Sequence, residues 1–342
     1  MKILSVIIPS YNSQQYLDKG IPSFVDEQIL DKLDIIIVND GSTDNTVEVA
    51  QKYCDLYPGS VRLISQVNKG HGGALNTGCA AAVGKYLKVI DADDWVETQN
   101  LKQYIDFLET CDSDVVLTHH YTIDISTGEV KKWMNYPETF GKAYRFEEIM
   151  ANWKSFDRSL TFHGITYNTA FYHQYGIQLS EHVFYEDHEF ATFPCCHAKS
   201  VTPVDLFIYD YRIGDVQQSV SDTNQLKRIG HTETVLKRFI TEYKKLPADC
   251  EGLGYVARKA QGLLVSYLTT AMLVEPDKKK GRAMGKAMMD LFARELPATA
   301  AMARKQYLAF GMMNRLGISK KTFEAVLHSN LYNRIRNNHD FN

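Results

Sequence analysis

The stretch around which the sequence is organised is Lys85-Tyr86-Leu87-Lys88-Val89-Ile90-Asp91-Ala92-Asp93-Asp94-Trp95. Its first part, Tyr86 to Ile90, is rich in β-branched and aromatic residues and has the length of a strand. Three carboxylates follow within four residues, and because they repel one another they require a compensating charge. A divalent cation would supply it, since Mg²⁺ and Mn²⁺ favour carboxylate oxygens. The simpler alternative is a solvated turn, with Asp94 capping the next helix.

Upstream and downstream of this stretch, residues 1–118 alternate between apolar runs and segments with helical periodicity. We expect strands at Ile3–Pro9, Asp34–Asn39, Val61–Ser65, Tyr86–Ile90 and Asp114–Thr118. We expect helices at Gln14–Glu27, Asp44–Asp55, Ala74–Val83 and Thr98–Glu109. This alternation predicts an α/β fold with a mostly parallel sheet that helices cover on both faces. In such sheets ligands bind beyond the carboxyl ends of the strands.

The residues after each strand are therefore candidates for a binding site. Ser10-Tyr11-Asn12-Ser13 follows the first strand, and Asn39-Asp40-Gly41-Ser42 follows the second. The segment Asn68–Gly78 follows the third strand as a glycine-rich loop that opens a helix, a form suited to phosphates. It does not match the P-loop pattern. The three carboxylates of the opening stretch follow the fourth strand. Each loop alone is consistent with ordinary turn chemistry, but four of them at one edge of a sheet indicate a site.

In this order, the motifs Ser5–Asn12, Ile36–Asp44, Asn68–Gly78 and Asp91–Asp94 resemble the family 2 glycosyltransferases. The resemblance covers residues 1–118 strongly and continues more weakly to about residue 222. These enzymes are inverting and metal-dependent, have the GT-A fold and use nucleotide-activated sugars. The resemblance implies a nucleotide-sugar site that includes Pro9, Tyr11, Asp40, Asn68, Lys69, His71, Asp91 and Arg212.

The resemblance also implies individual roles for some of these residues. Asp40 would contact the uracil edge of a UDP-sugar, and Asp91 would face the ribose. Asp93 would bind the Mn²⁺ or Mg²⁺ ion that bridges the diphosphate. The role of His71 within this site is left open.

The segment Phe184-Tyr185-Glu186-Asp187-His188-Glu189-Phe190 carries the candidate catalytic groups. Transfer with inversion needs a base that removes the proton of the acceptor hydroxyl. In the family, a Glu-Asp pair at the start of a helix has this role, which implies Asp187 as the base. Glu186 would orient the acceptor or the base. The alternative is that Asp187 caps a helix over Phe190–Ala198, and the two roles are compatible.

The remainder of the first 222 residues gives weaker signals. Residues 121–130 have the pattern of a β-hairpin with a turn near Ser126–Gly128. Thr161–Tyr167 is expected to be a strand, in which His163 either lines the site or is a structural histidine. A further strand, Leu206–Arg212, ends in the arginine that the resemblance places near the leaving phosphate.

A loop after this strand supplies a second candidate for contacting the phosphate, Gln218-Ser219. Family members that build long chains processively carry a Gln-x-x-Arg-Trp motif near this place. The sequence lacks that motif here, which favours the transfer of one sugar per cycle.

The cysteines and the apolar runs of the sequence indicate where in the cell the protein is expected. The 342 residues include six cysteines without C-x-x-C spacing, which favours reduced thiols in the cytoplasm over a disulfide framework or a zinc site. No run of eighteen apolar residues predicts a membrane span. The N-terminal apolar run is interrupted by Ser5 and is interpreted as a first strand rather than a signal peptide.

Charge divides the chain into two parts. Residues 1–224 carry 17 Lys and Arg against 31 Asp and Glu, whereas residues 225–342 carry 21 against 10. We expect a catalytic domain over 1–222, with a nucleotide-sugar half (1–118) and an acceptor half (119–222), and a basic helical domain over 223–342. The expected helices of this second domain are 224–246, 253–274, 278–296, 298–310 and 319–329.

The basic domain suggests an anionic partner. A membrane leaflet fits a cytoplasmic glycosyltransferase with a polyprenyl-linked or glycan acceptor, giving a peripheral location at the inner face of the membrane. Packing against the acidic domain, or self-association as a homo-oligomer, explains the charge equally well. Nucleic acid is not expected, because no nucleic-acid-binding motif accompanies the charge.

Together these observations favour an inverting glycosyltransferase that moves a single sugar from a UDP-sugar to an acceptor hydroxyl. The resemblance implies a hexosyltransferase in cell-surface polysaccharide or glycolipid assembly. The alternatives are a nucleotidyltransferase of similar fold and a non-catalytic sugar-nucleotide-binding or scaffold protein.

Overall fold

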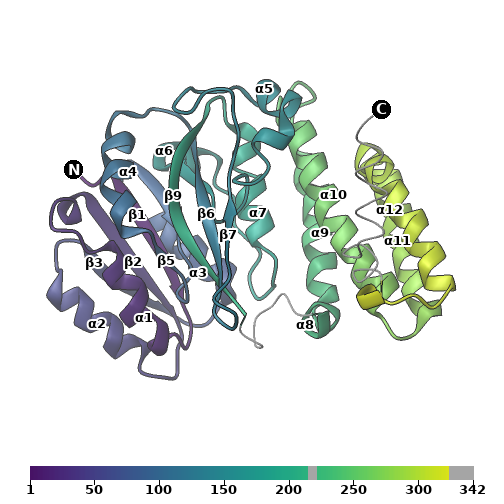
Figure 1. Ribbon diagram of the computed structural model, residues 1–342, viewed down its shortest axis with the longest axis horizontal. Coiled ribbons are helices and arrows are strands. Elements are labelled where there is room, and N and C mark those ends of the chain that lie inside the picture. The colour runs from purple at the N-terminus through teal and green to yellow at the C-terminus, as the bar shows by residue number, and fades with distance from the viewer. Residues whose placement is uncertain (215–221, 323–342) are drawn as a thin grey trace. The chain divides into compact units, whose positions relative to one another are not determined.

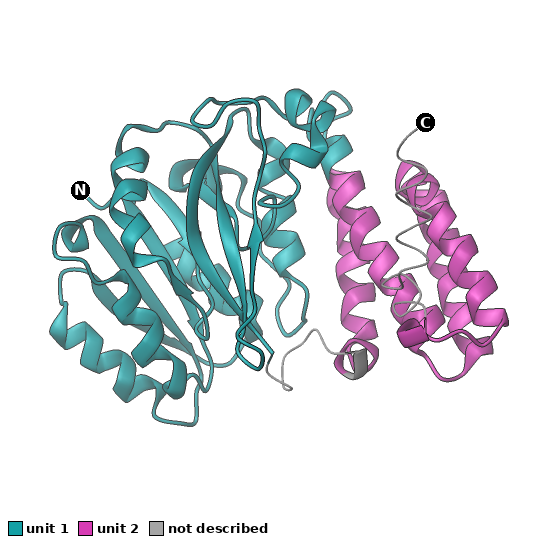
Figure 2. Cartoon of the chain, in the orientation of Figure 1, with its two compact units in different colours: residues 1–218, 246–255 teal, residues 219–245, 256–342 magenta. Residues whose placement is uncertain are grey.

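The computed structural model describes residues 1–214 and 222–322 (Figure 1). The chain forms two compact units, Met1–Gln218 with Leu246–Tyr255, and Ser219–Lys245 with Val256–Asn342 (Figure 2). The first unit is α/β and the second is helical in its described part. Residues 246–255 thus belong to the first unit although they follow helices of the second. The domain limits expected from the sequence, 1–222 and 223–342, stay predictions.

Nine strands of the described residues form one sheet in the first unit. They are β1 (Leu4–Ser10), β2 (Leu33–Asp40), β3 (Val61–Gln66), β4 (Tyr86–Val89), β5 (Trp95–Val96), β6 (Val115–Asp124), β7 (Val130–Trp133), β8 (Ile165–Asn168) and β9 (Val201–Ile213). Their order is β3-β2-β1-β4-β8-β6-β9-β5, with β7 beside β6 (Figure 1). β3, β2, β1 and β4 are parallel to one another, whereas β8 is antiparallel to both of its neighbours. The predicted parallel sheet is therefore its first four strands, and the rest is mixed.

Helices cover both faces of the parallel strands. The helices of the first unit are α1 (Gln14–Gly20), α2 (Thr46–Leu56), α3 (Gly70–Ala81), α4 (Thr98–Thr110), α5 (Phe146–Ala151), α6 (Thr169–Tyr175) and α7 (Asp187–Thr192), with short 3₁₀ turns at Ile21–Phe24, Leu30–Lys32, Trp153–Ser155 and Cys195–His197. Val6 of β1 lies in one buried cluster with Leu17 of α1 and Tyr104 of α4. Ile7, the next residue, points to the opposite face and contacts α3. A Cβ at Gly78 would lie 2.4 Å from the Ile7 side chain, so only glycine lets α3 pack this closely.

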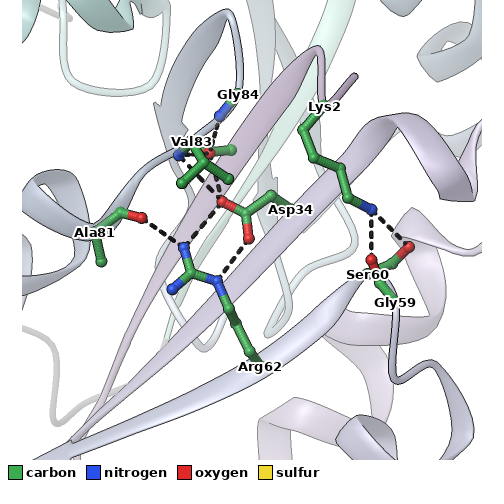
Figure 3. Close-up of polar contacts among 9 residues, drawn as sticks. Lys2, Asp34, Gly59, Ser60, Arg62, Ala81, Val83 and Gly84 are labelled. Atoms are coloured by element: carbon green, nitrogen blue, oxygen red, sulfur yellow. Dashed lines mark hydrogen bonds and ion pairs between the residues drawn. The ribbon is translucent and has the colours of Figure 1, made fainter.

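The amino-terminal ends of the first strands are joined by an ion pair between the buried Asp34 and the partly exposed Arg62 (Figure 3). Arg62 of β3 donates two hydrogen bonds to Asp34 of β2, at 2.7 and 3.1 Å, and a third at 2.6 Å to the carbonyl of Ala81. The Ser5 hydroxyl donates to Asp34 at 2.6 Å and accepts from the backbone of Gly84. These contacts fasten the end of the sheet opposite the site, which leaves the carboxyl edge available for function.

The second half of this unit differs in places from the expectations. β6 and β7 form the predicted hairpin, with Gly128 at φ +75° in its turn. The strand expected at Thr161–Tyr167 begins only at Ile165, because the backbone of Thr161 turns and accepts from Gly164 and Ile165. The helix expected over Phe190–Ala198 is wrong in both limits. It starts at Asp187 and ends at Thr192, just before Pro194, which lacks the N–H that a helix interior needs.

The described part of the second unit is helical, as predicted. Its helices are α8 (Asp222–Lys227), α9 (Ile229–Tyr243), α10 (Leu253–Thr269, whose first turn lies in the first unit), a π-helical turn (Thr270–Val274), α11 (Lys278–Glu295) and α12 (Pro297–Arg315). Asp277 caps α11 by accepting from two backbone N–H groups. Most of the helix expected over 319–329, and the 215–221 segment with Gln218-Ser219, lie outside the described residues. No helix within 1–214 or 222–322 has the length and apolar content needed to cross a bilayer.

Candidate active site

A pocket of about 370 Å³ lies at the carboxyl edge of the parallel strands. Its walls come from the segments after β1, β2 and β3 and from a segment just before α7. The lining residues are Pro9, Ser10, Tyr11, Asp40, Asn68, Gly70, His71, Ala74, His182, Val183 and Phe184. Five residues predicted for the nucleotide-sugar site are among them. Lys69, Asp91 and Arg212 are not, and residues 182–184 were not predicted to line the nucleotide-sugar site.

Asp40 is held firmly at the pocket. Its side chain is buried, and Oδ1 accepts from Gln66 Nε2 at 2.7 Å and from the backbone N–H of Lys69 at 2.8 Å. Its carbonyl accepts from the Asn68 amide at 2.9 Å. Gly41, at φ +73°, follows it, and a Cβ there would lie 2.9 Å from the backbone of Asn68. Neither side-chain bond uses Asp40 Oδ2, which leaves this carboxylate an oxygen for a ligand.

Two exposed aromatic rings stand at the pocket. Tyr11 is 53% exposed and Phe184 is 42% exposed. They come from opposite halves of the unit, and flat rings of this kind can stack on a nucleobase. The role of Tyr11 in holding the nucleobase stays a prediction, and Phe184 is a second candidate for the same contact.

The glycine-rich segment is more helical than expected, because α3 begins at Gly70 rather than at Ala74. The backbone N–H of His182 donates to the carbonyl of Lys69 at 3.0 Å, beside Gly70 at φ +76°. His182 and Tyr185 also have positive φ values, 56° and 76°, which side chains other than glycine rarely adopt. The segment before α7 is therefore held in a strained backbone against the start of α3.

His71 connects the two halves of the site. Its Nε2 lies 2.9 Å from Asp91 Oδ1, and its Nδ1 lies 2.5 Å from Glu186 Oε1. Both ring nitrogens thus donate to carboxylates, which requires the protonated imidazolium. Burial lowers the pKa of His71, but Asp91 and Glu186 outweigh it, so the pKa lies well above its usual value. His71 is therefore a positively charged bridge between β4 and the start of α7.

Glu186 and Asp187 occupy different positions at this helix start. Glu186 is buried and is the residue before α7, and its Oε2 has no hydrogen-bond partner among the described residues. Asp187 is the first helical residue and is half-buried. Since Glu186 occupies the N-cap position, the capping role considered for Asp187 is not what the structure shows. The role of Asp187 as the base stays a prediction.

The three acids after β4 have separate environments. Asp94 is buried and accepts from the Tyr209 hydroxyl at 2.6 Å and from the backbone of Arg212 at 2.7 Å. Burial, then the charges of Asp93 and Asp91, raise the pKa of Asp94 well above its usual value. Its expected role as a helix cap is wrong, because the residue before α4 is Glu97. Asp94 instead anchors β9 to the carboxylate loop.

Asp93 is paired with a cation from the chain itself. Arg212 Nη1 lies 3.5 Å from Asp93 Oδ2, and its guanidinium lies 4.9 Å from the centre of the Tyr16 ring. Burial, then the charge of Asp91, raise the pKa of Asp93 to about 6. Burial and the neighbouring Asp91 thus outweigh Arg212 and His71, whose charges lower the pKa of Asp93.

A divalent metal fits this site only with help from a ligand. Within the described residues no group of three or more His, Cys, Asp and Glu could hold an ion. The Asp94 carboxylate already accepts a hydrogen bond from Tyr209, and the Asp91 carboxylate already accepts one from His71. Mg²⁺ and Mn²⁺ are commonly held by one or two carboxylates plus substrate phosphates, and Asp93 together with a diphosphate would provide that set.

His163 behaves as a structural histidine. Its ring packs on Tyr211 and Tyr209, with centroids 4.2 and 4.8 Å apart. The buried Lys88 donates to its carbonyl at 2.8 Å. Burial, then the charges of His120 and Lys88, lower the pKa of His163 well below its usual value. The ring is therefore neutral and supports the aromatic layer beneath the carboxylate loop.

Gly72 of α3 allows the two halves of the site to approach each other closely. A Cβ at Gly72 would lie 2.2 Å from the carbonyl of Ser180 and 3.0 Å from Glu186 Cγ. Gly72→Ala is expected to lower the free energy of unfolding by about 1–3 kcal/mol, as overpacking does, and to displace the segment before α7. Urea unfolding measures this. Gly59→Ala, with nothing within 4 Å of the new Cβ, is the control, and equal losses in the two variants would contradict the prediction.

Comparison with known proteins identifies the family of this chain. The family model for glycosyl transferase family 2 matches residues 5–176, half of the chain. The chain belongs to glycosyl transferase family 2. Both the fold and the order of motifs predicted from the sequence agree with this assignment.

Two curated relatives and one solved structure illustrate the likeness. The chain is 40% identical over 131 residues to a glycosyltransferase of Nostoc sp., 38% of this chain and 39% of that protein. It is 28% identical over 245 residues to a cholesterol galactosyltransferase of Borreliella burgdorferi, 69% of this chain and 68% of that protein. The chain thus spans well under half of the first relative. TarS of S. aureus, solved with UDP-GlcNAc, matches with a TM-score of 0.63 over 93% of both chains at 18% identity, which confirms the GT-A fold with a helical C-terminal region.

Proposed function

We propose that the chain is an inverting glycosyltransferase that moves one sugar per cycle from a UDP-sugar to an acceptor hydroxyl. The observation that carries the proposal is the His71 bridge. It ties Asp91, on the loop after β4, to Glu186, the neighbour of the candidate base. A donor pocket and a carboxylate for the acceptor are thereby joined in one site. Family membership and the relatives that are glycosyltransferases support the same activity.

The donor occupies the pocket at the ends of β1, β2 and β3. Tyr11 and Phe184 stack on the base, and Asp40 Oδ2 accepts from its edge. Asn68 and Lys69 lie next to the phosphates, at the start of α3, where backbone N–H groups favour anions. The complex of TarS with UDP-GlcNAc supports a uridine nucleotide as the donor class.

The reaction is a single displacement at the anomeric carbon. Asp187 accepts the proton of the acceptor hydroxyl as its oxygen attacks. The bond to the diphosphate breaks on the opposite face, which inverts the configuration. Glu186, oriented by His71, holds the acceptor or Asp187 in place through its free Oε2. Arg212, 3.5 Å from Asp93, contributes positive charge where the diphosphate departs.

Asp93, together with the diphosphate of the donor, would hold a divalent cation, Mn²⁺ or Mg²⁺, which would supply further positive charge for the leaving nucleotide. Burial, and then the charge of Asp91, raise the pKa of Asp93, so a bound cation would stabilise the anionic form of this carboxylate.

The acceptor class and the location are proposed on the basis of the family, the cysteine content and the basic helices of the second unit. The enzyme acts in the cytoplasm on a glycan or polyprenyl-linked acceptor, in polysaccharide or glycolipid assembly, and associates peripherally with the membrane through its basic helices. Self-association remains compatible with this proposal.

A thermal-shift panel tests the function. UDP-, GDP- and dTDP-sugars are added with and without Mn²⁺, and we expect one UDP-sugar to stabilise the protein in a Mn²⁺-dependent way. At a ligand concentration of 100 times Kd the gain is about 2.7 kcal/mol, or a rise in Tm of roughly 5–10 °C. Asp93→Asn should lose the Mn²⁺-dependent part.

Asp112→Asn, a change at an exposed carboxylate of the same unit, is the control and should keep the full shift. Product analysis then separates sugar transfer, which releases UDP, from nucleotidyl transfer, which releases pyrophosphate. The proposal fails if no nucleotide-sugar stabilises the protein in the presence of Mn²⁺.

A further inference from the structure

The outer face of α12 carries a row of apolar side chains. Leu308, Met312 and Leu316 are 58%, 63% and 70% exposed. They are spaced four residues apart, so Leu308 and Met312 lie on one line along α12, and Leu316, the residue that follows its last turn, continues that line. Met302, six residues before Leu308, is also exposed. Isolated exposed apolar residues are normal, but a contiguous row of this kind marks an interaction surface.

The face of α12 opposite to this row packs against the rest of its own unit and fixes the orientation of the helix there. Phe310 and Ala303 are buried. Asn314 donates to the carbonyl of Met272 at 2.5 Å and accepts from Arg282 at 2.5 Å. The apolar row therefore faces away from the core that α12 shares with α11 and the π-helical turn.

Basic residues accompany the row. Arg304, Lys305 and Arg315 are exposed, and none of them forms an ion pair within the residues that the structure describes. No acidic residue occurs between Pro297 and Thr322. On α11, by contrast, Lys286 is paired with an aspartate one turn away. Among the described residues, no ion pair therefore neutralises the positive charge on the outer face of α12.

We propose that this face of α12, formed by Arg304, Lys305, Leu308, Met312, Arg315 and Leu316, is the docking surface for an anionic lipid bilayer. Flexible apolar side chains enter the boundary between headgroups and acyl chains, and the flanking basic side chains extend to the phosphates. Each Lys or Arg near an anionic leaflet adds to binding. The combination of an apolar and a basic contribution is what reversible membrane association requires.

The same residues disfavour two other partners. In a symmetric dimer through this face, Arg304, Lys305 and Arg315 would approach their own copies with no acid to offset them. Nucleic acid would use the charges but would leave Leu308 and Met312 without an apolar environment. The bilayer is the partner that satisfies both kinds of side chain.

The inference names the surface through which the protein associates with a membrane. It rests on the proposed function in one respect only, namely why the protein is located at a membrane. Its test therefore uses the full chain without any sugar nucleotide. Vesicles of phosphatidylcholine alone, and of phosphatidylcholine with 30% phosphatidylglycerol, are floated with the protein in 0.1 M NaCl. We expect binding to the anionic vesicles only, weakened at 0.5 M NaCl because salt screens exposed charges.

Two variants test the two components of the surface. Arg304→Gln/Lys305→Gln/Arg315→Gln should weaken binding by about fivefold per charge, or roughly a hundredfold. Leu308→Ser/Met312→Ser should weaken it by about tenfold or more, since each loses apolar burial. All five side chains are exposed, so both variants should retain the Tm of the parent protein.

The control removes three other exposed charges of the same unit, Lys237, Lys279 and Lys286, by replacement with Gln. Equal loss in control and α12 variants would overturn the proposal, as would unchanged binding in both α12 variants. Sedimentation velocity provides the other outcome: a dimer that Leu308→Ser/Met312→Ser dissociates would assign the face to a second copy. A missing nucleotide-sugar shift would refute the function but leave the vesicle result standing.

Discussion

Replacing Asp187 with Asn is expected to lower kcat by about 10²–10⁴-fold, the usual contribution of a general base. The amide is nearly the same size as the carboxylate but cannot accept the proton of the acceptor hydroxyl. Since Asp187 does not line the donor pocket, the thermal shift with UDP-sugar and Mn²⁺ should be unchanged. Release of UDP under saturating donor and acceptor measures the effect.

Glu181→Gln is the matched control, because Glu181 is an exposed acid six residues earlier in the same segment. It should retain turnover close to that of the parent chain. An Asp187→Asn enzyme with substantial turnover would remove Asp187 from the role of base. Loss of the nucleotide shift in the same variant would instead indicate a structural part for this carboxylate.

Much of the first half of the fold could be predicted because its signals are local. β1 and β2 are buried along their whole length, and this appears in the sequence as nearly continuous apolar runs. The rule that loops after parallel strands share one edge then places Tyr11, Asp40 and Asn68 together, and the structure confirms that they line one pocket.

The contacts between the two halves could not be predicted from such patterns. His71 and Glu186 are 115 residues apart, and nothing in the sequence around either indicates the other. Phe184 enters the pocket through a strained backbone that no periodicity reveals. The partner of Asp94 is Tyr209, which looked like any other strand residue. Long-range polar pairing depends on how β6, β8 and β9 complete the sheet, and mixed strand order has no sequence signature of this kind.

His71→Gln should lower kcat/KM for transfer by about a hundredfold, the cost of small misplacements of reacting groups. Glutamine can replace one of the two hydrogen bonds but carries no charge, so Asp91 and Glu186 lose their shared cation. The effect should fall on kcat more than on donor affinity, because the other ten residues that line the donor pocket are unchanged. A double-mutant cycle with Glu186→Gln should show that the two losses are far from additive, whereas strict additivity would mean that the bridge does not position the base.

The same bridge predicts a pH dependence of stability. His71 has a pKa in the folded state well above its usual value, so its contribution is fully present below the unfolded pKa of about 6.5 and is lost as the pH rises through the folded pKa. The side chain is 36% exposed, and solvent limits the gain to about 1–2 kcal/mol. The stability difference between the parent protein and His71→Gln should therefore be largest near pH 6 and shrink at alkaline pH, as urea unfolding at several pH values would show. His197→Gln is the control, because burial lowers the pKa of His197, and its difference should not change above pH 7. A His71 difference that grows with pH would contradict the assignment of an imidazolium bridge.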